Sequence, residues 1–295
     1  MLFVPRVGKP GEITAVVSPK STNAKFQDLP PPTGNPPYHL DYSKAFPMIA
    51  DGNRDGDGIV FHMVGDTGDT KNPSPAELVA LAMEADIDKS KPGRKAMFLY
   101  HVGDLVYKFG EASEYYSQFY DHYAHDPAPI FAIPGNKDGD VRPDSNVRSL
   151  QAFVNNFCAR ERGIVTPDAL EIPRDAMFQP NVYWTLDAPF VTIIGLYSNV
   201  PDGGVIKEDQ LGWFNHELEI ASQNKALIVA VHHAPFSGDE EHSGSDVMLK
   251  LLDKAFKSTD RLPDMVVSGH VHNYQRFTRK LGKHYIPFLV IGYTR

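Results

Sequence analysis

The sequence predicts a layered α/β domain. Strand-like apolar runs alternate with segments whose apolar residues recur at helical spacing, and this alternation continues through both halves of the chain. The halves meet at a predicted β-hairpin, with no linker between them. Strands that alternate with helices are typical of layered α/β folds. The length of 295 residues allows a sizeable core, in one large domain or two smaller ones, and the missing linker favours one.

The N-terminal segment differs in composition from the rest of the chain. Residues 1–55 are rich in Pro, Gly, Asn and Asp, which favours an extended arm on the surface of a domain formed by residues 56–295. The alternatives are that this arm covers the site or reaches a neighbouring subunit. The first residues lack the basic segment and the long apolar region of a secretory signal. We therefore expect a cytoplasmic location, unless a leader has been removed.

Three strands are predicted in the first half, each followed by a turn that contains a Gly-Asp or Gly-Asn pair. These strands are short apolar runs at residues 59–64, 96–101 and 129–133. A helix opens at residues 73–75 and would place Leu78, Leu81 and Ala82 on its apolar side. A second helix, polar and aromatic, is predicted near residues 111–122.

The second half begins with a helix around residues 147–158 and the hairpin. The hairpin strands are predicted at 182–185 and 190–195, and three further strands at 226–231, 265–267 and 286–291. The clearest helix, residues 207–223, has apolar residues at spacings of 3, 4 and 3, namely Leu211, Phe214, Leu218 and Ala221. Another helix is predicted at residues 246–256.

Composition excludes several classes of function. The net charge of −8 argues against a nucleic-acid or anionic-membrane partner, which would favour a basic surface. No apolar run approaches the ~18 residues of a membrane span. The single cysteine, Cys158, rules out an internal disulfide framework and a Cys-rich zinc site, and we expect it to be buried. The sequence does not indicate an oligomeric state.

Five successive strand ends carry side chains of the kind that bind metals. They are Asp66; Asp104 with Tyr107; Asn136; His232; and His270 with His272. Ligands of open α/β sheets bind at the carboxyl edge of the strands, so these residues are expected to converge. Oxygen and imidazole ligands without thiolate suit Fe, Zn or Mn. Eight ligand positions, one carboxylate being shared, would give each of two ions four protein ligands.

These motifs resemble a known superfamily. Gly-Asp, Gly-Asp-x-x-Tyr, Gly-Asn, Val-x-x-His and Gly-His-x-His, in this order between residues 59 and 291, are similar to the calcineurin-like metallophosphoesterases. The pattern is most similar to purple acid phosphatases, because Asp66-Thr67-Gly68 replaces the usual Asp-x-His and Tyr107 is present. The resemblance implies a four-layer αββα sandwich of two mixed β-sheets flanked by helices.

The resemblance also implies a metal centre and a reaction. A first ion, Fe(III), would be held by Asp66, Asp104, Tyr107 and His272. A second ion, Fe(II), Zn or Mn, would be held by Asp104, Asn136, His232 and His270. The implied reaction is acid-phosphatase-type hydrolysis of a small phosphomonoester, in which a metal-bound hydroxide attacks phosphorus and inorganic phosphate is released. The alternatives are a phosphodiesterase with the same centre, or a catalytically weakened phosphate- or nucleotide-binding protein.

Two further residues are candidates for catalysis. Lys137 stands where the superfamily has the histidine of Gly-Asn-His. We hypothesise that it holds the phosphate by hydrogen bonds; the alternative is that it points to solvent and activity is reduced. His242 lies ten positions after His232, where plant-type relatives carry a histidine that protonates the leaving group. The alternative for His242 is an exposed loop residue. His233 is expected beside the metal ligands, not among them.

Overall fold

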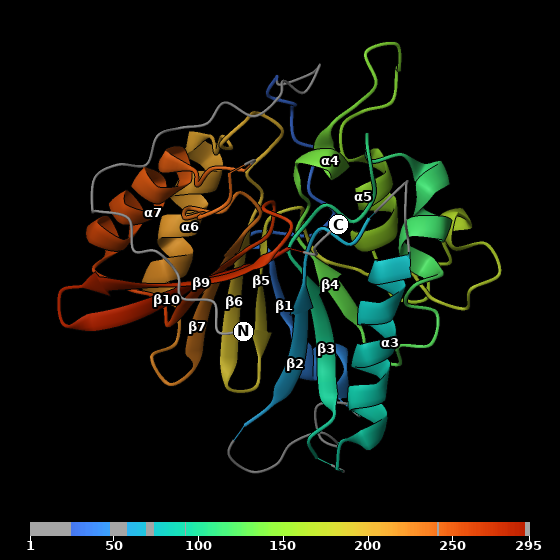
Figure 1. The fold of residues 1–295 in the computed structure, drawn as a ribbon, viewed down its shortest axis with the longest axis horizontal. Helices are drawn as coiled ribbons and strands as arrows, with labels where there is room; N and C mark the ends of the chain where they lie inside the picture. The colour runs from blue at the N-terminus through green and yellow to red at the C-terminus, as the bar shows by residue number, and fades with distance from the viewer. Residues whose placement is uncertain (1–24, 48–57, 69–73, 92, 241, 293–295) are drawn as a thin grey trace.

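Two β-sheets form the centre of the molecule, and helices cover their outer faces (Figure 1). The computed structural model describes residues 25–47, 58–68, 74–91, 93–240 and 242–292. The larger sheet contains, in spatial order, β1 (His39–Asp41), β5 (Trp184–Ala188), β6 (Val191–Leu196), β7 (Ala226–Val231), β8 (Met265–Ser268), β10 (His284–Ile291) and β9 (Tyr274–Leu281). The smaller sheet contains β2 (Val60–Val64), β3 (Ala96–His101) and β4 (Ile130–Ala132). The expected four-layer arrangement is confirmed.

The two sheets differ in strand direction. In the larger sheet the β5–β6 and β10–β9 pairs are antiparallel and the other pairs are parallel, so this sheet is mixed. Both pairs of the smaller sheet are parallel. The expectation of two mixed sheets was therefore wrong for the described strands of the smaller one. Its strands are joined by long crossover segments, and a crossover of this kind returns the chain in the same direction.

Helices on both sides complete the sandwich. The helical segments are α1 (Tyr42–Ala45), α3 (Ser74–Lys89), η1 (Ala112–Glu114), η2 (Tyr116–Tyr120), α4 (Asn136–Gly139), α5 (Gln151–Phe157), η3 (Pro167–Ala169), α6 (Glu208–Ile220) and α7 (Asp246–Thr259). Helices α6 and α7 cover the larger sheet, and α3 and α5 lie on the side of the smaller one (Figure 1). Among the described residues, no helix combines the length and the apolar character needed to cross a bilayer.

Aromatic side chains fill the space between the sheets. Trp184 of β5 is fully buried and contacts Phe131 and Tyr100, with ring centroids 5.5 and 6.1 Å away. Strand β3 shows why the smaller sheet is apolar on both faces, because Leu99 packs toward α3 while Tyr100 packs toward the larger sheet. Burial of each large side chain contributes on the order of 1.5–3 kcal/mol to folding.

Helix α3 buries a different face from the one expected. Leu78 and Leu81 are 65% and 50% exposed. The buried residues are instead spaced at intervals of 4, 3 and 4, and they are Ala76, Ala80, Met83 and Ile87. Alanines on this face let the helix approach the sheet closely. The prediction that Leu78, Leu81 and Ala82 form the buried side was therefore wrong.

Part of the predicted N-terminal arm belongs to the larger sheet. Strand β1 pairs in parallel with β5, and Leu40 and Tyr42 are buried. The hydroxyl of Tyr42 donates to the carbonyl oxygen of Met97 at 2.6 Å. Residues 1–24 and the predicted domain boundary at residues 55–56 lie outside the described residues.

Two other segments differ from their predictions. The segment near residues 111–122 forms the short helical turns η1 and η2 in place of one helix. Strand β9 was not predicted at all, because its alternating residues are charged and polar, with an exposed–intermediate burial pattern. Among the described strands it lies at the edge of the larger sheet, with β10 as its one paired neighbour.

Candidate metal centre

All seven predicted metal ligands follow the carboxyl ends of strands. Asp66 follows β2, Asp104 and Tyr107 follow β3, Asn136 opens α4 after β4, His232 follows β7, and His270 and His272 follow β8. The carboxyl edges of both sheets face the same end of the sandwich, the end at which α4 lies (Figure 1). Residues that are up to 206 positions apart therefore meet at one place.

Four of these residues have left-handed backbone conformations. The φ angles are 59° for Asp66, 55° for Asp104, 72° for His270 and 55° for His272. A left-handed conformation costs a residue with a side chain about 1–2 kcal/mol. Strain of this kind collects at functional sites, where the surrounding structure holds it in place. Here it turns each ligand side chain at the end of its strand.

Glycines allow two of the turns to touch. Gly103 has φ of 102°, and a Cβ atom there would lie 2.5 Å from the backbone nitrogen of Gly135. A Cβ atom on Gly135 would lie 2.1 Å from Oδ1 of Asp104. Both distances are shorter than any real contact, so a larger residue would push the turns apart. The glycine before Asp104 and the glycine before Asn136 thus bring these two side chains together.

The carboxylate of Asp138 fastens the same two turns. Its Oδ2 accepts the backbone N–H groups of Gly135 and Asp104 at 2.7 and 2.8 Å. Its Oδ1 accepts those of Leu105 and Val106 at 3.0 and 3.2 Å. Asp138 is 1% exposed. Burial raises the pKa of this carboxyl, and the N–H groups oppose that rise.

Asp66, Asp104 and His272 form a first cluster. Each offers one ligand atom, and these atoms lie within 4.8 Å of one another. The hydroxyl of Tyr107 lies 3.1 Å from Nε2 of His272, which in turn lies 3.6 Å from Oδ1 of Asp66. The carboxylate of Asp66 is oriented by the backbone N–H of His270, at 2.8 and 3.0 Å from its two oxygens.

Asn136, His232 and His270 form a second cluster that meets the first at Asp104. Oδ1 of Asn136 lies 3.0 Å from Nε2 of His232 and 3.2 Å from Nδ1 of His270. Nε2 of His232 lies 3.3 Å from Oδ1 of Asp104. The other nitrogen, Nδ1, is 2.9 Å from the carbonyl oxygen of Val102, to which it donates. This bond leaves Nε2 to face the cluster.

These distances fit two cations. Ligand atoms ~2.0–2.2 Å from one ion lie ~3.0–3.5 Å from each other on its coordination sphere. The separations of 3.0, 3.2 and 3.3 Å in the second cluster have this size. The atoms are mainly hydrogen-bond acceptors, which would repel each other without a proton or a cation among them. The cluster accordingly favours a positive charge at this place: Asp104 raises the pKa of His232 to about 9 despite the opposing effect of burial.

Two more buried histidines support the site: His233, which was expected beside the metal ligands, and His101, which was not. Nδ1 of His101 accepts the N–H of Gly103 at 3.2 Å, so Nε2 donates to Oγ1 of Thr67 at 2.8 Å. His233 contacts Oγ of Ser198 through Nδ1 at 2.7 Å, and its ring lies 4.5 Å from that of His270. Burial lowers the pKa of each imidazole to about 3, so both are neutral. The signal that could have indicated His101 is its place at the end of a buried strand, two residues before Gly103 and three before Asp104.

The two candidate catalytic residues lie beside the clusters. The backbone N–H of Lys137 donates to Oδ1 of Asp104 at 2.8 Å. Burial alone would raise the pKa of Asp104, but the charges of His232 and Lys137 hold it well below its usual range. The ring of His242 lies 5.1 Å from that of His272 and 5.4 Å from that of His270.

Strand β9 anchors the loop that carries His242. Oε1 of Gln275 accepts the N–H of Gly238 at 2.7 Å, and the amide of Asn273 donates to Asp239 at 3.1 Å. Asp239 also accepts the N–H of His242 at 2.9 Å, and its Oδ1 lies 3.8 Å from the imidazole Nδ1. The strand that was not predicted therefore positions one of the predicted catalytic residues.

Comparisons with known proteins agree with this arrangement. A family model described as calcineurin-like phosphoesterase matches residues 59–274. A comparison with curated proteins gave no match. Among solved structures, a purple acid phosphatase from yellow lupin (Lupinus luteus) seeds is similar with a TM-score of 0.52 and 17% identity, covering 79% of this chain and 43% of that chain. This chain thus spans less than half of the lupin protein.

Two further solved structures share the fold. GAP50, described as the anchor in the inner membrane complex of Plasmodium, has a TM-score of 0.54 and 14% identity, with 79% of this chain and 70% of that chain covered. A dimetal phosphatase from Danio rerio has a TM-score of 0.51 and 10% identity, with 78% and 86% covered. At these identities the likeness shows the fold alone.

Proposed function

Because the chain belongs to the calcineurin-like phosphoesterase family, we propose that it is a phosphomonoesterase with a dimetal centre of the purple acid type. The observation that carries this proposal is the position of Tyr107, whose hydroxyl lies 3.1 Å from Nε2 of His272, beside the cluster of Asp66 and Asp104. A phenolate ligand favours a ferric ion. A metallophosphoesterase without this tyrosine would have no such preference.

Seven side chains would hold the metals. We assign Fe(III) to the first cluster, formed by Asp66, Asp104, Tyr107 and His272. We assign Fe(II), Zn or Mn to the second, formed by Asp104, Asn136, His232 and His270. When bound, the two ions supply Lewis acidity, which activates water and offsets the charge of the phosphate group. The left-handed turns and the contacts of Asp138 hold the protein ligands in position for them.

The chain supplies the proton for the leaving group. We assign this role to His242, whose ring lies beside those of His270 and His272. With Nδ1 on the side of Asp239, Nε2 is the nitrogen that delivers the proton to the departing alkoxide. Lys137 would donate hydrogen bonds to a phosphate oxygen next to Asp104.

A visible spectrum combined with metal analysis tests the centre. The purified protein is expected to contain iron and to show a tyrosinate-to-Fe(III) charge-transfer band. Tyr107→Phe is expected to remove the band, whereas Tyr116→Phe, a change away from the clusters, is expected to keep it. A colourless, iron-free protein with full activity would rule out the purple acid type.

The choice between monoester and diester is tested separately. We expect hydrolysis of p-nitrophenyl phosphate to exceed that of bis(p-nitrophenyl) phosphate. The reverse order would favour the phosphodiesterase alternative, which the same dimetal centre could serve.

One observation favours a second candidate function. Lys137 stands at a position where the superfamily has a histidine. The second candidate is therefore a phosphate-binding protein with little turnover. Metal-loaded protein that binds inorganic phosphate but hydrolyses neither p-nitrophenyl ester would support it.

A further inference from the structure

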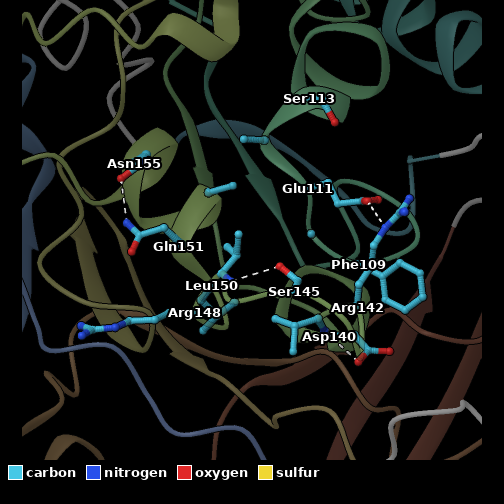
Figure 2. A pocket seen from close by; sticks show the side chains of 15 residues that line it. Phe109, Glu111, Ser113, Asp140, Arg142, Ser145, Arg148, Leu150, Gln151 and Asn155 are labelled. Carbon is cyan, nitrogen blue, oxygen red and sulfur yellow. Dashed lines mark hydrogen bonds and ion pairs between the residues drawn. The ribbon is translucent and has the colours of Figure 1, made fainter.

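A cavity of about 320 Å³ is lined by residues that follow two of the metal-ligand motifs along the chain. One wall comes from the loop after Tyr107, which carries Phe109 and Glu111. The opposite wall comes from the end of the segment that joins α4 to α5 and from the first turn of α5, including Leu150 and Gln151, whereas Arg142, near the start of that segment, lies on the side of Glu111. Figure 2 shows Glu111 and Arg142 on one side of the cavity and Leu150 and Gln151 on the other.

Both walls are fixed to the motifs that carry metal ligands. Phe109 is two residues beyond Tyr107, a separation of at most ~7 Å along the chain. Gly110 packs so closely on α4 that a Cβ atom there would lie 2.1 Å from the carbonyl oxygen of Asp138. On the other side, the hydroxyl of Ser149 donates to the carbonyl oxygen of Gly139 at 2.6 Å. These short connections place the cavity beside the turns that carry Tyr107 and Asn136.

The cavity combines apolar surface with hydrogen-bonding groups. The guanidinium of Arg142 lies 5.7 Å from the ring centroid of Phe109, and its Nε donates to Glu111 at 2.6 Å. Its Nη groups have no acceptor within the described part of the chain, so they can serve a ligand. On the other wall, Gln151 donates its Nε2 to Asn155 at 3.1 Å, which leaves Oε1 as an acceptor. Leu150 and Val147 add apolar surface.

The size and the lining together limit the occupant. A volume of 320 Å³ is at the lower end of ligand sites, which span roughly 300–1,000 Å³, and is too small for a peptide or an oligonucleotide. The planar guanidinium of Arg142 is suited to stacking on a flat ring. Donors and acceptors on facing walls would pair with polar groups on the edge of that ring.

We propose that this cavity receives the alcohol part of the substrate, and that the preferred substrates are phosphomonoesters whose alcohol carries a flat ring with hydrogen-bonding groups. This inference rests on the proposed phosphomonoesterase function. It assigns specificity to the loop after Tyr107 and to the α4–α5 segment, not to the metal ligands.

The test compares two esters with similar leaving groups. Uridine 5′-monophosphate carries a polar flat ring, and glycerol 3-phosphate has none, but both release a primary alcohol. The ratio of their kcat/KM values therefore reports recognition of the ring. We expect the parent enzyme to prefer the uridine ester by at least about tenfold. Gln151→Trp, which fills the cavity from an exposed helix position, is expected to lower the ratio by about tenfold or more.

The matched control is Leu78→Trp, which adds the same side chain at an exposed position of α3 away from the cavity. It is expected to leave the ratio unchanged. Arg142→Ala, which removes part of the opposite wall without adding bulk, is expected to lower the ratio in the same direction as Gln151→Trp. A parent ratio near one, or a ratio that neither cavity variant changes, would overturn the inference.

A binding measurement separates this inference from the proposed function. Calorimetry with the metal-loaded protein uses the methylene phosphonate analogue of uridine 5′-monophosphate, which is not hydrolysed. A Kd that rises at least about tenfold in Gln151→Trp supports the cavity even if the protein hydrolyses no ester, in which case only the proposed function fails. Equal Kd values for the parent and both cavity variants would overturn the inference even if hydrolysis is fast.

Discussion

Replacing Asp138 by Asn should weaken the fold and the metal centre together. The carboxylate accepts four backbone N–H groups, two on each oxygen, from Gly135, Asp104, Leu105 and Val106. An amide keeps one accepting oxygen and replaces the other by an NH₂ group, which cannot accept. Two backbone N–H groups then lose their partner in a position that water does not reach, because Asp138 is 1% exposed.

The size of the effect follows from those two lost contacts. An unsatisfied buried donor costs about 1–3 kcal/mol. Two of them give a loss of about 2–6 kcal/mol, which is a large fraction of the 5–15 kcal/mol that keeps a typical domain folded. The two groups that remain bonded also lose the negative charge that strengthens their hydrogen bonds. We therefore expect a loss of at least about 2 kcal/mol.

Urea unfolding of metal-free protein measures this loss without interference from bound ions. The matched control is Asp144→Asn, the same change at an exposed position, which should shift stability by less than about 0.5 kcal/mol. Metal affinity of Asp138→Asn should fall as well, because Asp104 sits on the turn that Asp138 fixes. Unfolding of Asp138→Asn at the same urea concentration as the parent would refute this reasoning.

Three further predictions concern protonation and a buried hydroxyl. Lowering the pH from 7 to 5 should destabilise the metal-free protein, because His101 and His233, with pKa values of about 3 when folded and 6.5 when unfolded, take up protons only on unfolding. Each of these histidines lowers the free energy of unfolding by about 2 kcal/mol at pH 5. In urea unfolding, the stability of His101→Gln should therefore depend less on pH than that of the parent. His242→Ala should lower kcat about 100-fold for glycerol 3-phosphate but much less for p-nitrophenyl phosphate, whose leaving group needs no proton; equal losses would argue against a proton donor. Tyr42→Phe should cost about 1 kcal/mol in urea unfolding, through loss of the bond to Met97, and no change would show that this bond contributes nothing.

The position of the predicted metal ligands at strand ends could be predicted because two simple rules determine it. Apolar runs identify the strands, and ligands gather at the carboxyl ends of parallel strands. Both rules act locally, so Asp66, Asp104 and His232 could be placed at strand ends without knowledge of the tertiary structure. Their distances from one another could not be predicted. They depend on contacts such as that between Gly103 and Gly135, which join segments 32 residues apart.

The elements that were missed lack a local signal. Strand β9 is an edge strand whose residues alternate between exposed and partly buried, and β1 has only three residues within a proline-rich segment. Both strands form because a neighbouring strand offers free hydrogen-bonding groups, β10 in one case and β5 in the other. The prediction for α3 failed because it relied on the large leucine side chains at positions 78 and 81, which are exposed. The buried face of the helix instead contains the small alanines at positions 76 and 80.

The strained turns and the acceptor clusters belong to one arrangement. Four ligand residues in left-handed conformations cost together about 4–8 kcal/mol, and the facing acceptors add repulsion between them. The contacts that offset this cost come from residues outside the two ligand clusters: Asp138 binds the turns after β3 and β4, His101 binds Thr67 next to Asp66, and Val102 orients His232. Since these contacts do not involve a metal, they would hold the predicted ligands in position whether or not an ion is bound. Binding energy is then available for affinity, because little of it is needed to order the site.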